Sequence, residues 1–328
     1  MSRPGPGPAP ATSAEAIALI EAASGPGELF GADAARSYRR LARLTHPDTC
    51  PGDERTARAF AKLASLWQRH QAALRSGRQA GPLVARGDMA NLYRFGPGLL
   101  KLVRDPADND LMRREAEALT RLRDQADARF RAYFPSLVRA LRQEDIRSGI
   151  RRHANLIGPL TGFRSLAEVR SAFPAGVDPR DAAWMWRRLL VAAGAAHRAG
   201  VIHGAVLPEH VMIHPAEHGL VLVDWCYSVP APAGRLRAVV QRYRPWYPPE
   251  VLAGQPAGPD LDIWLATRCM TELIGGRMPP RMAAFARGCL LASPARRPRD
   301  AWRLLAEFDE LLECLYGPRT YRPFAMPA

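Results

Sequence analysis

The sequence predicts an α+β protein in which an all-helical N-terminal domain precedes a larger domain of mixed helices and strands. Before about residue 76, apolar residues recur at the three- and four-residue spacing of amphipathic helices. From about residue 83, short Val- and Leu-rich segments typical of strands alternate with helical segments. A stretch rich in Gly, Ser, Arg and Gln separates the two patterns, and 328 residues are enough for two such domains.

The N-terminal region begins with a Pro/Gly-rich segment that we expect to be a disordered tail, because it has no apolar run to bury and none of the features of a signal peptide. Thr12-Ser-Ala-Glu15 is a capping box, in which Thr and Glu side chains satisfy free amides at a helix start. It predicts a first helix over 14–23.

Two further helices are predicted on either side of a loop. In the first of them Ala35, Tyr38, Leu41 and Ala42 share an apolar face, and arginines recur on another face. Residues 49–53 form the loop. In the helix that follows, Phe60, Leu63 and Trp67 are spaced i, i+3 and i+7.

The loop begins with His46-Pro47-Asp48, and with these flanking helices the segment resembles the J-domain of DnaJ-type co-chaperones. The resemblance implies that these three residues engage a DnaK-type chaperone and stimulate its ATP hydrolysis. It also implies that basic residues of the preceding helix dock on an acidic chaperone surface; these are Arg36, Arg39, Arg40 and Arg43. The alternative is an ordinary helical hairpin with a proline turn, and the first helix lacks the family's usual aromatic residue.

The net charge of +14 suggests nucleic acid as a partner, but the basic residues do not support that function. Of 46 Lys and Arg residues only Lys62 and Lys101 are lysine, so arginine replaces lysine throughout the chain. The arginines are spread over both halves, without a basic run interleaved with aromatic residues. Nucleic-acid binding is therefore a minor alternative.

The five cysteines form no C-x-x-C pair, which favours reduced thiols in the cytoplasm over a disulfide framework or a zinc site. We expect Cys289 and Cys314 to fill the core. The longest apolar run, 189–196, is too short to span a bilayer, so no membrane association is expected.

The second region has a recognisable order of elements. Short strands are expected over 91–95 and 99–103, followed by a helix over 110–123 with Leu111, Leu119 and Leu122 as core positions. A long apolar helix over 181–199 and strands over 211–213 and 220–223 come next, and the remainder is largely helical.

This region resembles the two-lobed protein-kinase fold. The resemblance depends on several segments in family order: 196–203 before the catalytic loop, 204–212 in the loop, Asp224-Trp-Cys226 in place of Asp-Phe-Gly, Pro248-Pro-Glu250, Asp262-Ile-Trp264 and Arg297-Pro298. It implies a buried Glu250–Arg297 ion pair, and an Asp262 carboxylate that accepts backbone hydrogen bonds from the 203–205 loop above a packed His203.

The predicted organisation is a tail over 1–12, a J-domain over 13–75, a linker over 76–83, a kinase-like domain over 84–316 and a tail over 317–328.

Three residues with nucleotide-binding roles in kinases are retained. The resemblance implies that Lys101 contacts phosphates, that Glu115 pairs with Lys101, and that Asp224 binds Mg²⁺. The cofactors it implies are ATP and Mg²⁺. A lysine retained in an arginine-biased chain favours this role, because Arg and Lys bind phosphate differently; the alternative is a chance lysine on an edge strand. The phosphate-binding loop is poor in glycine, so nucleotide binding is not secured.

The catalytic loop is damaged. Ala205 replaces the aspartate that accepts the substrate proton, Leu207 replaces a lysine, and His210 replaces the second metal-binding asparagine. For His210 a solvated loop residue is the favoured interpretation, and a ligand of a transition metal is the alternative. The candidate metal ligands are Asp224 and, in that alternative, His210.

The sequence hypothesis is therefore a J-domain co-chaperone with a catalytically impaired kinase-like domain, acting as an adaptor or nucleotide sensor for a client or partner protein that the sequence does not identify. The alternative is an atypical phosphotransferase, a kinase or AMP-transferring enzyme targeted by its J-domain. The missing general base favours a non-enzyme, since general acid–base catalysis contributes ~10²–10⁴ in rate.

Overall fold

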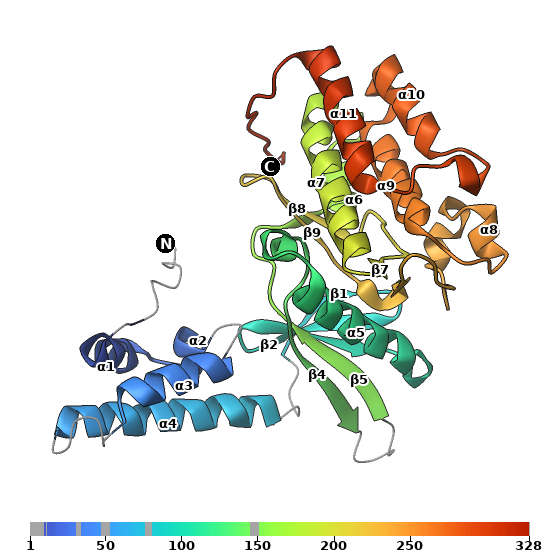
Figure 1. The fold of residues 1–328 in the computed structure, drawn as a ribbon. Helices are drawn as coiled ribbons and strands as arrows, with labels where there is room; N and C mark the ends of the chain where they lie inside the picture. Colours follow the sequence, from blue (N-terminus) through green and yellow to red (C-terminus); the bar gives the residue numbers. More distant parts are fainter. Residues whose placement is uncertain are drawn as a thin grey trace. The chain divides into compact units, whose positions relative to one another are not determined.

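The computed structural model describes residues 10, 12–30, 34–46, 53–75, 81–144 and 151–327 (Figure 1). The chain divides into two compact units. Unit 1 comprises 1–87, 91–102 and 156–158, and unit 2 comprises 88–90, 103–155 and 159–328. Both helices and sheets are present, as the α+β prediction requires.

The N-terminal part of unit 1 is helical. Its helices are α1 (Ser13–Ala22), α2 (Pro26–Leu29), α3 (Ala34–Leu44) and α4 (Glu54–Arg75). The predicted capping box is confirmed, because the Glu15 amide donates to the Thr12 hydroxyl and the Thr12 amide donates to the Glu15 carboxylate. α1, α2 and α3 all pack along α4 (Figure 1).

The core of these helices is apolar and closely packed. Ile20, Leu63 and Leu66 are fully buried, and the Tyr38 and Trp67 rings are stacked with their centroids 4.5 Å apart. Phe30, which the sequence did not single out, is 1% exposed and meets Trp67 edge to face. The amphipathic faces predicted for α3 and α4 are therefore the faces that pack.

The strands in the described residues form three sheets. One has the order β1-β2-β3-β5-β4, with β4 at an edge, and the smaller ones have the orders β6-β8-β9 and β10-β7. Their bounds are β1 Leu83–Arg86, β2 Ala90–Phe95, β3 Gly98–Val103, β4 Leu137–Glu144, β5 Arg151–Ile157, β6 Arg164–Ser165, β7 Val201–Ile202, β8 Val211–His214, β9 Gly219–Leu222 and β10 Val229–Pro230. The strands expected near 91–95, 99–103, 211–213 and 220–223 are all present.

Seven α-helices complete unit 2 in the part of the chain that is described. They are α5 Asn109–Gln125, α6 Leu166–Ala172, α7 Pro179–Arg198, α8 Pro249–Leu252, α9 Pro259–Ile274, α10 Pro280–Cys289 and α11 Ala301–Tyr316. The apolar α7 is the centre of this unit, since it packs against α9, α11 and β9. Its Trp186 is fully buried and contacts the Phe308 ring of α11 at a centroid distance of 4.8 Å.

An internal ion pair in unit 2 links helix α8 to the segment that precedes α11. Arg297, 4% exposed, bonds the Glu250 carboxylate and also donates to the carbonyls of Leu291 and Ala292. The pairing expected from the sequence is therefore confirmed. The carbonyl bonds matter because a buried guanidinium is stable only when its remaining N–H groups are also satisfied.

The expectation for the cysteines is confirmed for one residue and wrong for another. Cys289 is buried, but Cys314 is exposed. The buried positions of α11 are Ala301, Leu304 and Phe308, and Cys314 lies six residues beyond the last of them, off that face of the helix. None of the four cysteines in the described residues forms a disulfide bond. Among those residues, no helix combines the length and the apolar character needed to cross a bilayer.

Candidate functional site

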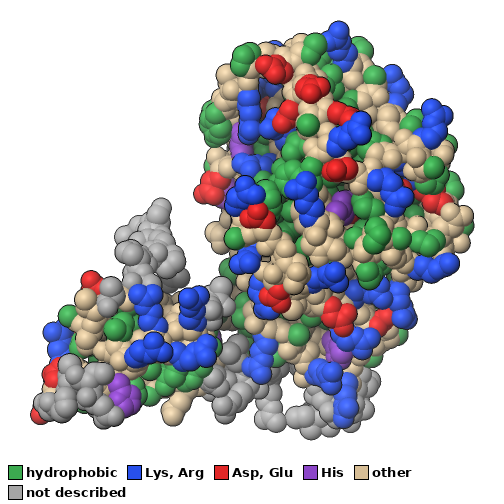
Figure 2. All heavy atoms as spheres, in the orientation of Figure 1, with side chains coloured by type: hydrophobic (Ala, Val, Ile, Leu, Met, Phe, Trp, Pro, Cys, Tyr) green, Lys and Arg blue, Asp and Glu red, His purple; other side chains and the backbone are tan. Residues whose placement is uncertain are grey.

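The first candidate site is the exposed basic side of α3. We call Arg36, Arg39, Arg40 and Arg43 the arginine face; all four are exposed and line one hollow together with Pro10 and Leu44. Their spacing of i, i+3, i+4 and i+7 puts them on one side of a helix whose opposite side packs on α4. Figure 2 shows Lys and Arg side chains gathered over this helix. Such a concentration of positive charge attracts an acidic partner.

The chain leaves α3 next to this face. α3 ends at Leu44, and both the Thr45 amide and the Thr45 hydroxyl donate to the Leu41 carbonyl of its last turn. His46 follows in an exposed position, with its ring 5.3 Å from the Phe60 ring of α4. The sequence-predicted His46 therefore lies at the end of the arginine face. Pro47 and Asp48 lie outside the described residues.

The second candidate site is built around the segment 203–210 of unit 2, here called the 203–210 loop. Asp262 of α9 is fully buried and accepts hydrogen bonds from the amides of His203 and Gly204, each at 2.8 Å. The His197 imidazole donates to the same carboxylate at 2.8 Å. Burial acts to raise the pKa of Asp262, but these donors outweigh it and hold the pKa below its usual value. The expectation for Asp262 is confirmed.

His203 has a single tautomer in this arrangement. Its Nε2 lies 2.9 Å from the Val223 carbonyl, which can only accept, and its Nδ1 accepts from the Ala205 amide at 3.1 Å. Nε2 therefore carries the proton and Nδ1 the lone pair. Burial lowers the pKa of His203 to about 4, so the ring is neutral near pH 7.

The positions to which the sequence resemblance assigns phosphoryl-transfer chemistry hold buried apolar residues. Ala205, Val206 and Leu207 are all fully buried. A methyl or isobutyl group can neither accept a proton nor stabilise a developing negative charge. The neighbouring acid, Glu209, is bound at 2.8 Å to Arg242. These three side chains therefore offer neither a proton acceptor nor a cation in the 203–210 loop.

His210 is not a solvated loop residue, and the favoured sequence interpretation of it is wrong. His210 is 8% exposed, and its Nδ1 lies 2.8 Å from the Ala205 carbonyl oxygen. The ring lies near the Tyr227 ring, with the centroids 6.5 Å apart and the planes 18° from parallel. The sequence could not show this burial, because it depends on residues that come later in the chain.

Asp224 lies opposite His210, with its Oδ2 3.4 Å from His210 Nε2. The backbone of Asp224 is left-handed, at φ 66° and ψ 63°, a conformation that costs a non-glycine residue energy and often marks a functional position. The next residue, Trp225, is fully buried and donates its indole N–H to the Leu222 carbonyl at 2.7 Å. This anchor holds Asp224 in place.

Glu115 and Cys226 join Asp224 in a group that we call the Asp224 cluster. One ligand atom from each of the three residues lies within 4.8 Å of the other two. Glu115 is 2% exposed, and its Oε2 accepts from the Asn155 side-chain amide at 2.9 Å. The same amide donates to the Met112 carbonyl, so Asn155 fixes the carboxylate relative to its own helix.

Lys101, also predicted as a nucleotide-binding residue, lies on β3 and is 4% exposed. It belongs to unit 1, whereas Glu115 and Asp224 belong to unit 2. Its pairing with Glu115 stays a prediction. The structure thus brings together two of the three predicted nucleotide-binding residues within one unit.

The residues present fit Mg²⁺ only in part. Mg²⁺ prefers oxygen ligands in octahedral geometry, and Asp224 offers such an oxygen. His210, at the position where the sequence resemblance implies an oxygen ligand, offers an imidazole nitrogen instead, which suits transition metals. The His210–Asp224 pair therefore does not fit Mg²⁺ as its ion.

Sequence reasoning missed the partners of these residues. Tyr227 donates its hydroxyl to the Asp88 carboxylate at 2.6 Å, and burial, followed by this bond, raises the pKa of Tyr227. Asn155 was missed as well. A polar Asn between the apolar residues at the end of β5 was the one signal that could have identified it, because a buried amide requires partners.

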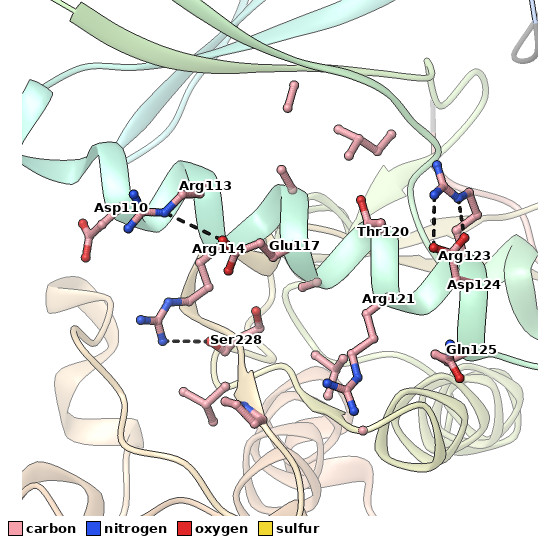
Figure 3. A pocket seen from close by; sticks show the side chains of 18 of the residues that line it. Asp110, Arg113, Arg114, Glu117, Thr120, Arg121, Arg123, Asp124, Gln125 and Ser228 are labelled. Atoms are coloured by element: carbon pink, nitrogen blue, oxygen red, sulfur yellow. Dashed lines mark hydrogen bonds and ion pairs between the residues drawn. The ribbon is translucent and has the colours of Figure 1, made fainter.

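A third feature is an open groove of about 1020 Å³ along α5, here called the α5 groove. It is bounded by α5, by Leu137–Ala140 of the edge strand β4, and by residues 200–201 and 228–230. Arg113 and Arg123 contact the acids Glu117 and Asp124. By contrast, Arg114 donates to the Ser228 carbonyl (Figure 3). Arg121 donates to the Ala199 carbonyl. These interactions do not neutralise either charge.

No protein-family model matches the chain, and a search of curated proteins found no significant match.

Proposed function

We propose that the N-terminal helices form a J-domain that stimulates ATP hydrolysis by a DnaK-type chaperone, and that the rest of the chain is a catalytically impaired kinase-like domain serving as an adaptor. The observation that carries the proposal is the arginine face of α3, exposed and ending at His46. This combination of residues is the one on which the J-domain resemblance depends.

The arginine face supports the proposal physically. Four guanidinium groups on two turns of one helix repel each other, and an acidic docking partner relieves that repulsion. Interactions of this kind speed association and weaken as salt rises, because the Debye length shortens from about 10 Å at 0.1 M to about 3 Å at 1 M ionic strength. Binding to the chaperone should therefore be strongly salt-dependent.

The buried Ala205 and Leu207 support an adaptor over an enzyme. An ordinary phosphotransferase needs a base near the substrate hydroxyl and a cation near the transferred phosphate, and these two positions supply neither. The α5 groove offers the adaptor a docking surface, since the carbonyl-bound Arg114 and Arg121 favour an acidic segment of a client.

The test is chaperone ATP turnover in the presence of the full-length protein. We expect saturable stimulation by the wild type, almost none by His46→Gln, and a several-fold weaker apparent affinity for Arg40→Glu. Arg69→Ala is the matched control, because Arg69 is an exposed arginine of α4 outside the arginine face. Equal stimulation by wild type and His46→Gln, or none by the wild type, would contradict the proposal.

The second candidate function is an atypical phosphotransferase, and the proximity of Glu115 and the backbone-strained Asp224 favours it. It predicts that the full chain binds ATP with Mg²⁺ or Mn²⁺ and transfers label to protein. Binding and transfer should be lost in Lys101→Ala and Asp224→Ala. Saturable binding without transfer would instead support a nucleotide-sensing adaptor.

A further inference from the structure

The segment after α11 lies against the start of α7 (Figure 1). We call residues 318–327 the tail segment. It contains neither helix nor strand, and among the described residues no hydrogen bond between backbone groups joins it to the rest of the chain. Side chains from Tyr321 to Phe324 hold it in place. A segment held in this way opens at a lower free-energy cost than the core of a domain.

An aromatic contact anchors the tail segment. Phe324 is 6% exposed, and its ring is stacked on that of Phe173, which follows α6, with the centroids 5.6 Å apart. It also meets the Trp184 ring of α7 edge to face at 6.2 Å. Trp184 in turn is stacked on His218, from the turn between β8 and β9, at a centroid distance of 4.2 Å. Three separate segments therefore build one aromatic surface beneath Phe324.

A charge contact lies beside the aromatic one. Arg322 Nε is 2.9 Å from Oδ1 of Asp181, a residue of α7 that is 8% exposed. Asp178, which lies 3.4 Å from Arg277, is also 3.7 Å from Arg322. Burial raises the pKa of Asp181, and Arg322 is the strongest of the charges that oppose this rise. A segment that covered Asp181 without supplying a cation would leave a buried charge unpaired, which is costly. The surface therefore selects a basic segment.

The spacing of the two contacts matches an extended segment laid along a helix. Pro323 disfavours a helical conformation at the residue before it, and alternate residues of an extended segment point to the same side. At about 3.3 Å per residue, Arg322 and Phe324 are about 6.6 Å apart on that side. Their partners Asp181 and Trp184 are three residues apart on α7, where side chains are separated by about 5–6 Å. The recognised element is thus a basic residue, a proline and an aromatic residue in sequence.

This surface also has hydrogen-bonding groups that the tail segment does not use. The indole Nε1 of Trp184 and Nε2 of His218 are buried and have no hydrogen-bond partner among the described residues. Buried polar groups normally have one. An extended segment whose backbone carbonyl reached Trp184 would therefore bind more favourably than the tail segment does. We call the surface the tail-binding face; it consists of Phe173, Asp178, Asp181, Trp184 and His218.

We propose that the tail-binding face is a docking site for a segment of a partner protein in which a proline separates a basic from an aromatic residue, and that the tail segment occupies it as a competitor. Extended segments that contain proline commonly dock on surfaces lined by aromatic side chains. Because the tail segment is attached to α11, its high effective concentration keeps weaker segments away. The inference goes beyond the proposed function and does not depend on it, since every residue involved lies in unit 2 and outside the α5 groove.

The test is fluorescence anisotropy of a labelled peptide of residues 318–327 with the full-length protein. In the double variant Arg322→Ala/Phe324→Ala the chain's own tail segment no longer competes. We expect this variant to bind the peptide saturably, and the wild type to bind it at least about tenfold more weakly. Arg319→Ala is the matched control and should behave as the wild type, because Arg319 is an exposed arginine of the same segment, outside these contacts. Circular dichroism would verify that each variant is folded.

Changes on both sides of the contact test the recognition itself. Arg322→Glu or Phe324→Ala in the peptide should abolish its binding to the double variant. Adding Asp181→Asn to the double variant should weaken binding several-fold, because the charge is lost while the shape of the side chain is kept.

Three results would overturn the proposal. If the folded double variant did not bind the peptide, the tail segment would pack on this face without being recognised. Equal binding by wild type and double variant would mean that the tail segment does not occupy the face. A wild-type dimer in size-exclusion chromatography that is lost in the double variant would place the tail segment on a second copy of the chain instead.

Discussion

The arginine face of α3 and the 203–210 loop differ in what surrounds their polar side chains. On α3 the four arginines are exposed, and the helix is held through its opposite, apolar side. In the 203–210 loop, His203 and His210 are buried, and each ring has a specific partner on the backbone. The comparison teaches that the arginines of α3 contribute little to the fold and are available to a partner, whereas the buried groups hold the fold itself.

The largest expected loss of stability comes from replacing Asp262, the buried carboxylate that binds the 203–210 loop. Asp262→Ala leaves the amides of His203 and Gly204 and the His197 ring without their acceptor. Each unsatisfied buried donor costs about 1–3 kcal/mol, so we expect the free energy of unfolding to fall by about 4 kcal/mol. Urea denaturation would measure the loss. Asp262→Asn, which keeps one acceptor oxygen, should lose less, and an equal loss would contradict this account.

The next largest loss of stability is expected from a truncation in the apolar core of the N-terminal helices. Leu63 is fully buried among the α1–α4 core residues, and Leu63→Ala removes atoms and leaves a cavity. We expect a loss of about 3 kcal/mol in the free energy of unfolding, typical of such truncations. Loss of helical circular dichroism with denaturant would show it. The exposed Leu19→Ala is the control, and a similar loss there would mean that the packing is not what stabilises these helices.

Acid should destabilise the buried loop through His203. Its folded pKa, about 4, lies below the ordinary value of 6.5, so the unfolded chain binds more protons between these pH values. Stability is therefore full above pH 6.5 and falls as the pH drops toward 4. At about 1.4 kcal/mol per pKa unit the difference is about 3 kcal/mol. We expect His203→Gln to flatten the stability curve over this range, and an unchanged curve would be the contrary result.

The smallest effect on stability is expected at the arginine face. Arg43→Ala should change the free energy of unfolding by no more than about 0.5 kcal/mol, because the side chain is exposed. The same variant should bind the chaperone more slowly, and raised salt should reduce the difference from wild type. Stopped-flow association at two salt concentrations would measure this. A large loss of stability would mean that the arginines do contribute to the fold.

Much of the local structure could be predicted from the sequence. The capping box at Thr12, the apolar face of α3 and the long helix α7 follow from residue spacing, which is a local property. The Asp262 contacts were predicted through a family resemblance rather than through spacing. His210 and Cys314 were predicted incorrectly, because the exposure of a single side chain depends on what other segments cover it.

The sequence by itself determined the α+β character, the helical hairpin with its arginine face, and the apolar character of Ala205 and Leu207. Only the tertiary structure decided that His210 is buried, that its Nε2 lies 3.4 Å from Asp224 Oδ2, and that Glu115 and Cys226 lie beside that carboxylate. The physical reason is the distance along the sequence between the residues that decide each feature. Helix periodicity is set by neighbours three and four residues apart, whereas these residues come from segments up to about a hundred residues apart that meet only when the chain has folded.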